Sequence, residues 1–309
     1  MPTEEPGAEA AVVNGKIYVI GGLEGEVTYV YDPATNNWTT KTPLPRGIGM
    51  PLAVYRGKIY AIGGKLNQVY DPVADTWENR TGMPTPRSGL SANVVDGKIY
   101  LIAGKTGGAY STVDVHEVYD PETDTWTTAA PIPYPVAGYA SVVVDGKIYV
   151  MGGQDEFHDP MNLNFTQIYD PETDTWSQGV QMPTATVDAP AEVTTGIKAP
   201  QRIHVLGGSV GLFEGTDRHL IYDPESDEWT RGPPIPTPRA DPGGAVVDDL
   251  IYVIGGLSSP GGFPWEYTAA NERYTPAGWI PEYPTWAPIL LLMVVLTVTV
   301  AIYTTKIKN

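Results

Sequence analysis

The sequence has no cysteine and comparatively few basic residues. Without cysteine the chain forms no disulfide and offers neither a thiol nucleophile nor a thiolate ligand for a metal. Lys and Arg total 19 against 36 Asp and Glu, which gives a formal net charge of −17. Nucleic acid is therefore not an expected partner, because the phosphate backbone selects basic surfaces.

Motifs for hydrolytic or metal-dependent catalysis are also missing. The histidines form no HExxH pair, and no G-x-S-x-G nucleophile elbow occurs. We therefore name no catalytic residue and expect no cofactor, and an enzyme is the less favoured class.

What the sequence does contain is one unit repeated six times. The segment GKIYVIGG at 15–22 returns at 57–64, 97–104 and 146–153, with weaker copies at 201–208 and 249–256. A spacing of about 40 to 55 residues is typical of a repeat architecture.

Each unit has the same order of strand and turn signals. A small or apolar strand leads to a two-residue turn such as Asp96-Gly97, and the apolar KIYVIGG-type strand follows. A third strand ends in Tyr-Asp-Pro, and a Trp seven residues after that Tyr opens a fourth strand. Four antiparallel strands per unit, without a helical pattern, predict an all-β, six-bladed β-propeller.

This order of glycine pair, Tyr and Trp resembles the Kelch repeat over about 8–281. The resemblance implies that the double glycines and aromatic residues are structural and hold the blades together. They are Gly21, Gly22, Tyr31, Trp38, Gly63, Gly64, Tyr70, Trp77, Gly104, Tyr119, Trp126, Gly152, Gly153, Tyr169, Trp176, Gly207, Gly208, Tyr222, Trp229, Gly255, Gly256, Tyr274 and Trp279. Blade 3 departs by having Ala103 before Gly104, and blade 6 lacks Asp after Tyr274.

The chain divides into a propeller at 1–281 and a C-terminal segment at 282–309. The expected blades are 3–42, 43–83, 84–132, 133–182, 183–234 and 235–281, and we expect all four strands of each blade to come from one contiguous repeat. The C-terminal segment comprises a short linker, a transmembrane helix and a basic tail.

The transmembrane prediction rests on 23 uncharged residues from Tyr283 to Thr305. A helix of that length is about 34 Å long, enough to cross a bilayer. Lys306 and Lys308 follow, so the positive-inside rule predicts a single-pass membrane protein with residues 285–305 in the membrane, an extracytoplasmic propeller and a cytoplasmic C-terminus. The tail also resembles the PEF-type sorting signals of archaeal surface proteins, which implies anchoring at the cell surface.

The expected ligand site lies on the face that carries the second-to-third strand loops and the links between blades, because loop length varies most there. Arg46, Arg87 and Arg239 occupy similar positions before the innermost strands of blades 2, 3 and 6. They would grip a carboxylate or sulfate near the central opening, or else bond to a neighbouring blade as ordinary repeat residues.

Two further features belong to the same face. Asp155, Glu156, His158 and Asp159 form an acidic loop that would hold a hard cation such as calcium, or else be only a solvated loop. Aromatic candidates for a sugar or protein surface, which would otherwise pack their own loops, are Phe157, Phe213, Phe263, Trp265 and Tyr267.

These observations predict a membrane-anchored, outward-facing Kelch propeller that binds a protein or a glycan through its variable face. The first alternative is an enzyme acting on an acidic sugar, similar to a mutarotase or epimerase, with the three arginines as substrate clamps. The second alternative is a structural component of the cell surface.

Overall fold

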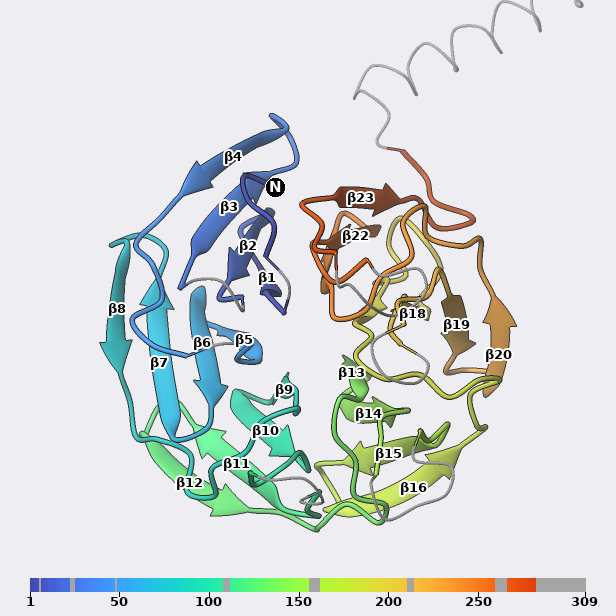
Figure 1. Cartoon of the computed structure of the whole chain (residues 1–309). Helices are drawn as coiled ribbons and strands as arrows, with labels where there is room; N and C mark the ends of the chain where they lie inside the picture. The colour runs from blue at the N-terminus through green and yellow to red at the C-terminus, as the bar shows by residue number, and fades with distance from the viewer. Residues whose placement is uncertain are drawn as a thin grey trace, which may run out of the picture.

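A computed structural model of the chain describes residues 1–5, 7–22, 26–47, 49–107, 112–155, 162–209, 214–258 and 266–281. These residues form six antiparallel sheets arranged as blades around a central axis (Figure 1). The prediction of an all-β, six-bladed propeller is confirmed. The innermost strand of each blade lies next to the axis, and the outermost strands follow the perimeter.

Five blades contain four strands in sequence order, whereas blade 6 contains three among the described residues. Blade 1 is β1 (Glu9–Val13), β2 (Lys16–Ile20), β3 (Thr28–Asp32) and β4 (Asn37–Thr40). Blade 2 is β5 (Leu52–Tyr55), β6 (Lys58–Gly63), β7 (Leu66–Asp71) and β8 (Thr76–Asn79). Blade 3 is β9 (Ala92–Val95), β10 (Lys98–Ile102), β11 (His116–Asp120) and β12 (Thr125–Thr128).

The second half of the ring continues in the same way. Blade 4 is β13 (Ala140–Val144), β14 (Lys147–Met151), β15 (Thr166–Asp170) and β16 (Thr175–Gly179). Blade 5 is β17 (Ala191–Val193), β18 (Ile203–Leu206), β19 (His219–Asp223) and β20 (Glu228–Arg231). Blade 6 is β21 (Gly243–Val247), β22 (Leu250–Ile254) and β23 (Asn271–Tyr274).

The turn between the first two strands has the predicted backbone form. Asp96 and Gly97 have φ angles of 48° and 76°. Positive φ at both central residues is the type I′ geometry that matches the twist of a hairpin. Each second strand is then buried on both sides: in β10, only Lys98 is exposed and Ile99–Ile102 are buried.

The glycine pair ends the second strand where neighbouring backbone leaves no room for a side chain. A Cβ atom on Gly152 would lie 2.5 Å from the carbonyl oxygen of Thr186 in the link to the next blade. Gly152 and Gly153 also have φ angles of 69° and 90°. Both sterics and backbone conformation therefore require glycine there.

One repeated set of hydrogen bonds, which we call the seam latch, joins neighbouring blades. Between blades 1 and 2, Asp75 Oδ1 accepts from the backbone N–H of Thr42 at 2.9 Å, and the indole Nε1 of Trp77 donates to the carbonyl of Thr42 at 3.0 Å. The hydroxyl of Tyr70 donates to the same oxygen of Asp75 at 2.6 Å. A single residue thus uses both of its backbone polar groups to hold the next blade.

The latch recurs in three further seams with the same spacing. In every case the residue held lies four positions after the Trp of its own blade. The held residues and the Asp and Trp that hold them are Thr81 with Asp124 and Trp126, Ala130 with Asp174 and Trp176, and Val180 with Asp227 and Trp229.

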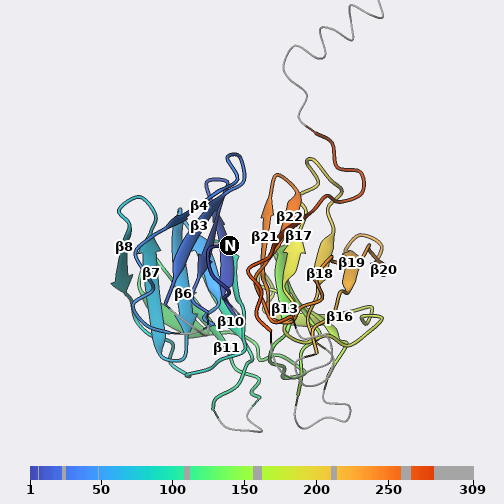
Figure 2. The same ribbon diagram turned by 45° about the horizontal axis from the view of Figure 1, so that its top comes forward.

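The chain after β23 leaves the blade without forming a fourth strand in the described residues. Trp279 donates its indole N–H to the carbonyl of Asp248 at 2.9 Å, and the N–H of Ile280 bonds to the carbonyl of Lys198 at 2.7 Å. This segment therefore lies against the hairpin turns of blades 5 and 6 (Figure 2). Among the residues that the structure describes, blade 6 therefore shows three of its four expected strands.

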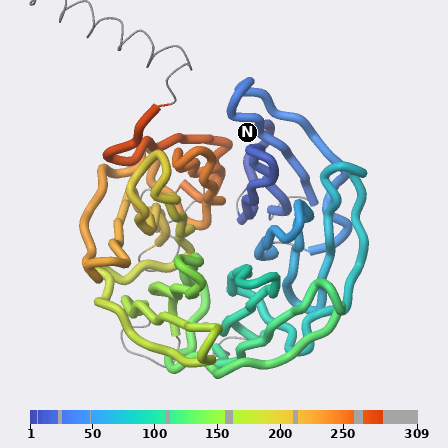
Figure 3. Tube along the Cα trace, turned by 180° about the vertical axis from the view of Figure 1, so that it is seen from behind, coloured from blue at the N-terminus to red at the C-terminus, as the bar shows by residue number. Residues whose placement is uncertain are grey.

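Blades 6 and 1 close the ring by apolar packing. Figure 3 shows the first and last blades side by side at the seam between them. A buried cluster spans this seam, and in it the rings of Tyr31 and Tyr252 are 6.0 Å apart. The N-terminal ammonium group also donates to the carbonyl of Ala269 in blade 6 at 2.8 Å.

No helix in the described part of the chain is long and apolar enough to cross a bilayer. The predicted membrane segment at 285–305 lies outside that part.

Candidate functional site

A ring of turns surrounds the central axis where each link enters its innermost strand. The six equivalent residues have φ angles between 51° and 66°, and they are Gly7, Gly49, Gly89, Gly138, Asp188 and Asp241. Backbone hydrogen bonds of 2.8 to 2.9 Å connect Gly89, Gly138, Asp188 and Asp241 from blade to blade. Since this left-handed conformation favours Gly and tolerates Asp, the backbone accepts either residue, but only Asp adds a charge.

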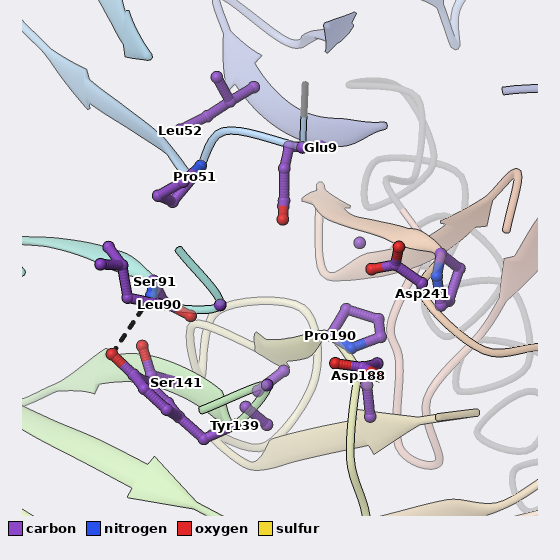
Figure 4. Close-up of a pocket in the computed structure, with 18 of the residues that line it drawn as sticks. Glu9, Pro51, Leu52, Leu90, Ser91, Tyr139, Ser141, Asp188, Pro190 and Asp241 are labelled. Carbon is purple, nitrogen blue, oxygen red and sulfur yellow. Dashed lines mark hydrogen bonds between the residues drawn. The ribbon is translucent and has the colours of Figure 1, made fainter. Parts of the chain in front are cut away.

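These turns and the first residues of the innermost strands line a cavity of about 370 Å³ (Figure 4). Four carboxyl groups belong to its lining, namely Glu9, Asp188, Glu192 and Asp241. Figure 4 shows the side chains of Glu9, Asp188 and Asp241 directed into the open space. The described residues that line it include no Lys, Arg or His.

The charge is confined to one side of the cavity. Blades 1, 5 and 6 supply the four carboxyl groups, whereas blades 3 and 4 supply neutral polar groups such as Ser91, Tyr139 and Ser141. The hydroxyl of Tyr139 accepts from the backbone N–H of Ser91 at 3.2 Å (Figure 4). The cavity is therefore asymmetric, with an acidic wall facing a neutral one.

Burial makes each carboxyl group harder to ionise, and for Glu9, Asp188 and Glu192 a neighbouring carboxyl group adds to the effect. Burial, and next the charge of Asp241, raise the pKa of Glu9 to about 8. Burial and the charge of Glu9 raise the pKa of Glu192 to about 8. Burial raises the pKa of Asp188 to about 7, with Asp241 acting in the same direction and Lys105 against it. Burial also raises the pKa of Asp241.

Burial therefore favours the protonated form of all four groups, and Glu9 and Glu192 retain protons near neutral pH. A cation entering the cavity would favour the ionised carboxylates and release those protons. The arrangement is suited to a positively charged group, and its carboxyl groups repel an anion once they are ionised.

Two of the three predicted arginine clamps are buried inside their blades. Arg87 is 1% exposed, and its guanidinium group lies 2.8 Å from the carboxylate of Glu117 and 2.7 Å from the carbonyl oxygens of Ala103 and Val115. Arg239 is 0% exposed and lies 2.6 Å from Glu272. The prediction that these two side chains grip a ligand near the central opening is wrong, and so is the alternative that they bond to a neighbouring blade. Each bonds within its own blade.

Arg46 is exposed but lies out of register with the other two. Arg87 and Arg239 each precede the positive-φ turn residue by two positions, whereas Arg46 precedes Gly49 by three. Gly47 therefore takes the position of Arg87 in blade 2. The structure does not bring the three arginines together, and none of them lines the cavity.

Most of the other predicted ligand residues lie outside the described residues: Glu156, Phe157, His158, Asp159, Phe213, Phe263 and Trp265. Asp155 is buried and accepts from the hydroxyl of Thr112 at 3.1 Å. Tyr267 is half-buried and forms a bridge with Leu257. No group of three potential metal ligands occurs within the described part of the chain.

The acidic wall was missed at the sequence level, although a signal was present. Alignment of the six links places Asp188 and Asp241 where four other repeats have glycine. Glu9 and Glu192 carry no such signal. Alternate side chains of an innermost strand point to opposite faces of the sheet, but this alternation does not show which side chain reaches the central axis.

Three comparisons relate the chain to known proteins. The model of the KLHDC2/KLHL20/DRC7 Kelch-repeats domain matches residues 7–208 and 84–256. An F-box/kelch-repeat protein of Arabidopsis thaliana is 35% identical over 104 residues, which are 34% of this chain and 28% of that protein. The N-acetylneuraminate epimerase of Pasteurella multocida is 40% identical over 67 residues, which are 18% of each protein.

A solved structure, "Structure of YjhT", superimposes with a TM-score of 0.74 and covers 88% of this chain and 95% of that one. Its sequence identity of 17% supports the fold alone. The chain spans less than a third of the length of the two sequence relatives named above.

Proposed function

Since the chain belongs to the Kelch-repeat family, we propose that its propeller is a protein-binding module whose central cavity receives a basic side chain of the partner. The observation that carries this proposal is the acidic wall, which has four carboxyl groups and no basic residue in the described lining. A lysine or arginine side chain is long and narrow, so it fits an opening of about 370 Å³ that a folded domain cannot enter.

The same wall disfavours the alternative of an enzyme acting on an acidic sugar. Such a substrate would meet four carboxyl groups, and two of the three arginines assigned to grip it are buried in the Arg87–Glu117 and Arg239–Glu272 pairs. The predicted aromatic surface for a glycan rests on the sequence alone, since only Tyr267 of that set is described.

Titration of the full chain with a lysine-rich peptide and with a glutamate-rich peptide of equal length tests the proposed function. We expect saturable binding of the basic peptide only, with release of protons at pH 7 measured in two buffers of different ionisation enthalpy. Glu192→Gln and Asp188→Asn should each weaken binding several-fold. Equal binding of the basic peptide by both variants would contradict the proposal.

We propose in addition that residues 285–305 anchor the propeller to a membrane with its binding face outside the cytoplasm. The uncharged run and the two lysines after it support this proposal. Full-length chain should sediment with membranes, and chain ending at Pro281 should not. Protease added to intact cells should degrade the propeller, and a protected propeller would contradict the proposed orientation.

A further inference from the structure

Among the described residues, the outer edge of blade 6 lacks the fourth strand that every other blade has. Strand β23 pairs with β22, and no described residue pairs with its other edge. The aromatic packing is incomplete in the same place. In the other five blades the Tyr of the third strand stacks on the Trp of the fourth, with ring centroids 4.9 to 5.1 Å apart. Among the described residues, the ring contacts of Tyr274 are with His204 and His219 of blade 5 instead.

Blade 1 presents the matching half of a seam latch with nothing in it. Asn36 occupies the position of Asp75, and its side-chain oxygen accepts from the hydroxyl of Tyr31 at 2.9 Å, as the latch requires. Trp38 occupies the position of Trp77 and stacks on Tyr31. Within the described residues, however, the indole N–H of Trp38 donates to no acceptor, and no backbone N–H donates to Asn36.

We propose that the open edge of β23, together with Asn36 and Trp38, accepts an extended strand from a partner protein. The four latched seams define what such a strand must carry. It needs an aromatic side chain opposite Tyr274, and four residues later a residue other than proline. That residue would donate its N–H to Asn36 and offer its carbonyl to Trp38. Addition of a strand to an exposed sheet edge is a common mode of peptide recognition.

The described parts of the chain do not supply this strand. The segment that follows β23 is held against blade 5 through the 2.7 Å bond between Ile280 and Lys198. The strands of this chain that carry the aromatic pattern are β4, β8, β12, β16 and β20, and each already pairs within its own blade. A second copy would therefore have to break a blade to donate one of them, so a separate polypeptide is the better occupant.

The site lies at the rim of the propeller and does not depend on the central cavity. A blocked peptide that copies residues 124–131 (DTWTTAAP) is a suitable probe, because it contains Trp126 and, four residues later, Ala130. Its binding to the full chain is measured by fluorescence anisotropy of a labelled copy. We expect saturable binding, at least tenfold weaker for a peptide with Ala130→Pro, which lacks the latch N–H.

Matched protein variants locate the bound peptide. Trp38→Phe keeps the ring and removes only the indole N–H, and it should weaken binding about fivefold, the loss expected for one hydrogen bond. Trp77→Phe makes the same change in an occupied latch and should leave peptide affinity unchanged, as should Glu192→Gln in the cavity. Equal affinity of Trp38→Phe and the natural chain would overturn the proposal.

Cross-linking reads the register directly, because the chain has no cysteine of its own. Arg273→Cys lies one residue before Tyr274 on the exposed part of β23 and should form a disulfide with a peptide bearing Thr127→Cys. Ile221 is the equivalent position in blade 5, but it already pairs with Thr230 of β20. Ile221→Cys should therefore not form a disulfide with the peptide. Similar cross-linking yields at positions 273 and 221 would overturn the proposal. The proposal would also be overturned if the chain associated with itself and Trp38→Phe abolished that association, because a second copy would then occupy the edge.

Discussion

Blades 1 to 5 are joined by four seam latches, whereas the two seams of blade 6 have none among the described residues. The difference follows from three small changes in sequence. Pro233 stands four residues after Trp229, where a latch needs a backbone N–H. Blade 6 has no Asp in its Tyr274–Trp279 turn, and that turn is two residues shorter than in the other blades. A latch is thus an optional addition to a blade, not a condition for forming one.

The unlatched side of the ring is also the acidic side. Glu9, Asp188, Glu192 and Asp241 all belong to blades 1, 5 and 6. Ionisation of these groups therefore places repulsion at the two seams that have no latch. One of these, between blades 5 and 6, is bonded instead through Asp249, which accepts from the backbone N–H groups of Thr195, Lys198 and Ala199. Apolar packing around Tyr31 and Tyr252 holds the closing seam against that repulsion.

The largest expected effect comes from the Arg–Glu ion pair that both the latched blade 3 and the unlatched blade 6 contain. Arg87→Met leaves the buried Glu117 without its ion-pair partner in blade 3, and Arg239→Met removes the partner of the half-buried Glu272 in blade 6. Each should lower the free energy of unfolding by about 3–5 kcal/mol, measured by urea denaturation. Arg46→Met, on an exposed side chain, should change it by less than about 0.5 kcal/mol. A large loss of unfolding free energy in Arg46→Met would contradict the assignment of Arg87 and Arg239 as the arginines that stabilise their blades.

The next largest effect is the difference in stability loss between a substitution in an occupied latch and one in the empty latch of blade 1. Asp75→Ala removes hydrogen bonds from Thr42 and Tyr70, and should cost about 2 kcal/mol. The bond from the Tyr70 hydroxyl, and then those from Thr42, hold the pKa of Asp75 below its usual range, so this contribution should fade as the pH falls through that depressed pKa. Asn36→Ala loses only one hydrogen bond, from Tyr31, and carries the same left-handed backbone cost as Asp75→Ala, so it should cost about 1 kcal/mol less than Asp75→Ala. Equal losses would show that both seams are latched.

The acidic wall should make the unlatched seams sensitive to pH. Its carboxyl pKa values are higher in the folded chain than in the unfolded one, so the folded state binds more protons between about pH 4 and pH 8. Stability should therefore fall as the pH rises through that range. Glu192→Gln should recover on the order of 1 kcal/mol at pH 8 and nothing at pH 4, measured by thermal unfolding. A stabilisation equal at both pH values would rule out this explanation.

The smallest expected effect is the loss of one indole hydrogen bond. Trp77→Phe should cost about 0.5–1 kcal/mol because Thr42 loses a donor to its carbonyl. Trp38→Phe, whose indole N–H has no acceptor in the described residues, should be neutral in the absence of a partner. Amide hydrogen exchange of Thr42 reports the first change, and a measurable loss in Trp38→Phe would indicate an acceptor already present.

The repeat pattern predicted the ring because each copy reflects local backbone and packing requirements that every blade must meet. The φ values of Asp96 and Gly97 and the crowding at Gly152 are local requirements that every blade must meet. The seam latch was equally visible, since an Asp lies five residues after each latch Tyr, as Asp75 follows Tyr70. The missing strand of blade 6 was not, because a shortened turn before Trp279 does not reveal where the chain goes instead.

The candidate site was harder to predict because it depends on contacts between distant repeats. The arginines appeared equivalent because a Pro-Arg pair recurs in the links that lead to blades 2, 3 and 6. One extra residue in blade 2 displaced Arg46 from the register of Arg87. Residues that meet at the axis, such as Glu9 and Glu192, are more than 180 positions apart in the chain. Their proximity follows only when the ring is closed.

The latch also has a direction. Each held residue, such as Thr42, is clamped by the blade that comes after it in the sequence, so every blade from 1 to 4 becomes secure only when its successor has formed. No latch secures blade 5 or blade 6 within the described residues. During synthesis these blades are completed last. In the finished ring we expect the seam between blades 6 and 1 to open first, because Asp249 bonds blade 6 to blade 5. Such an opening would give the central cavity a second entrance from the side.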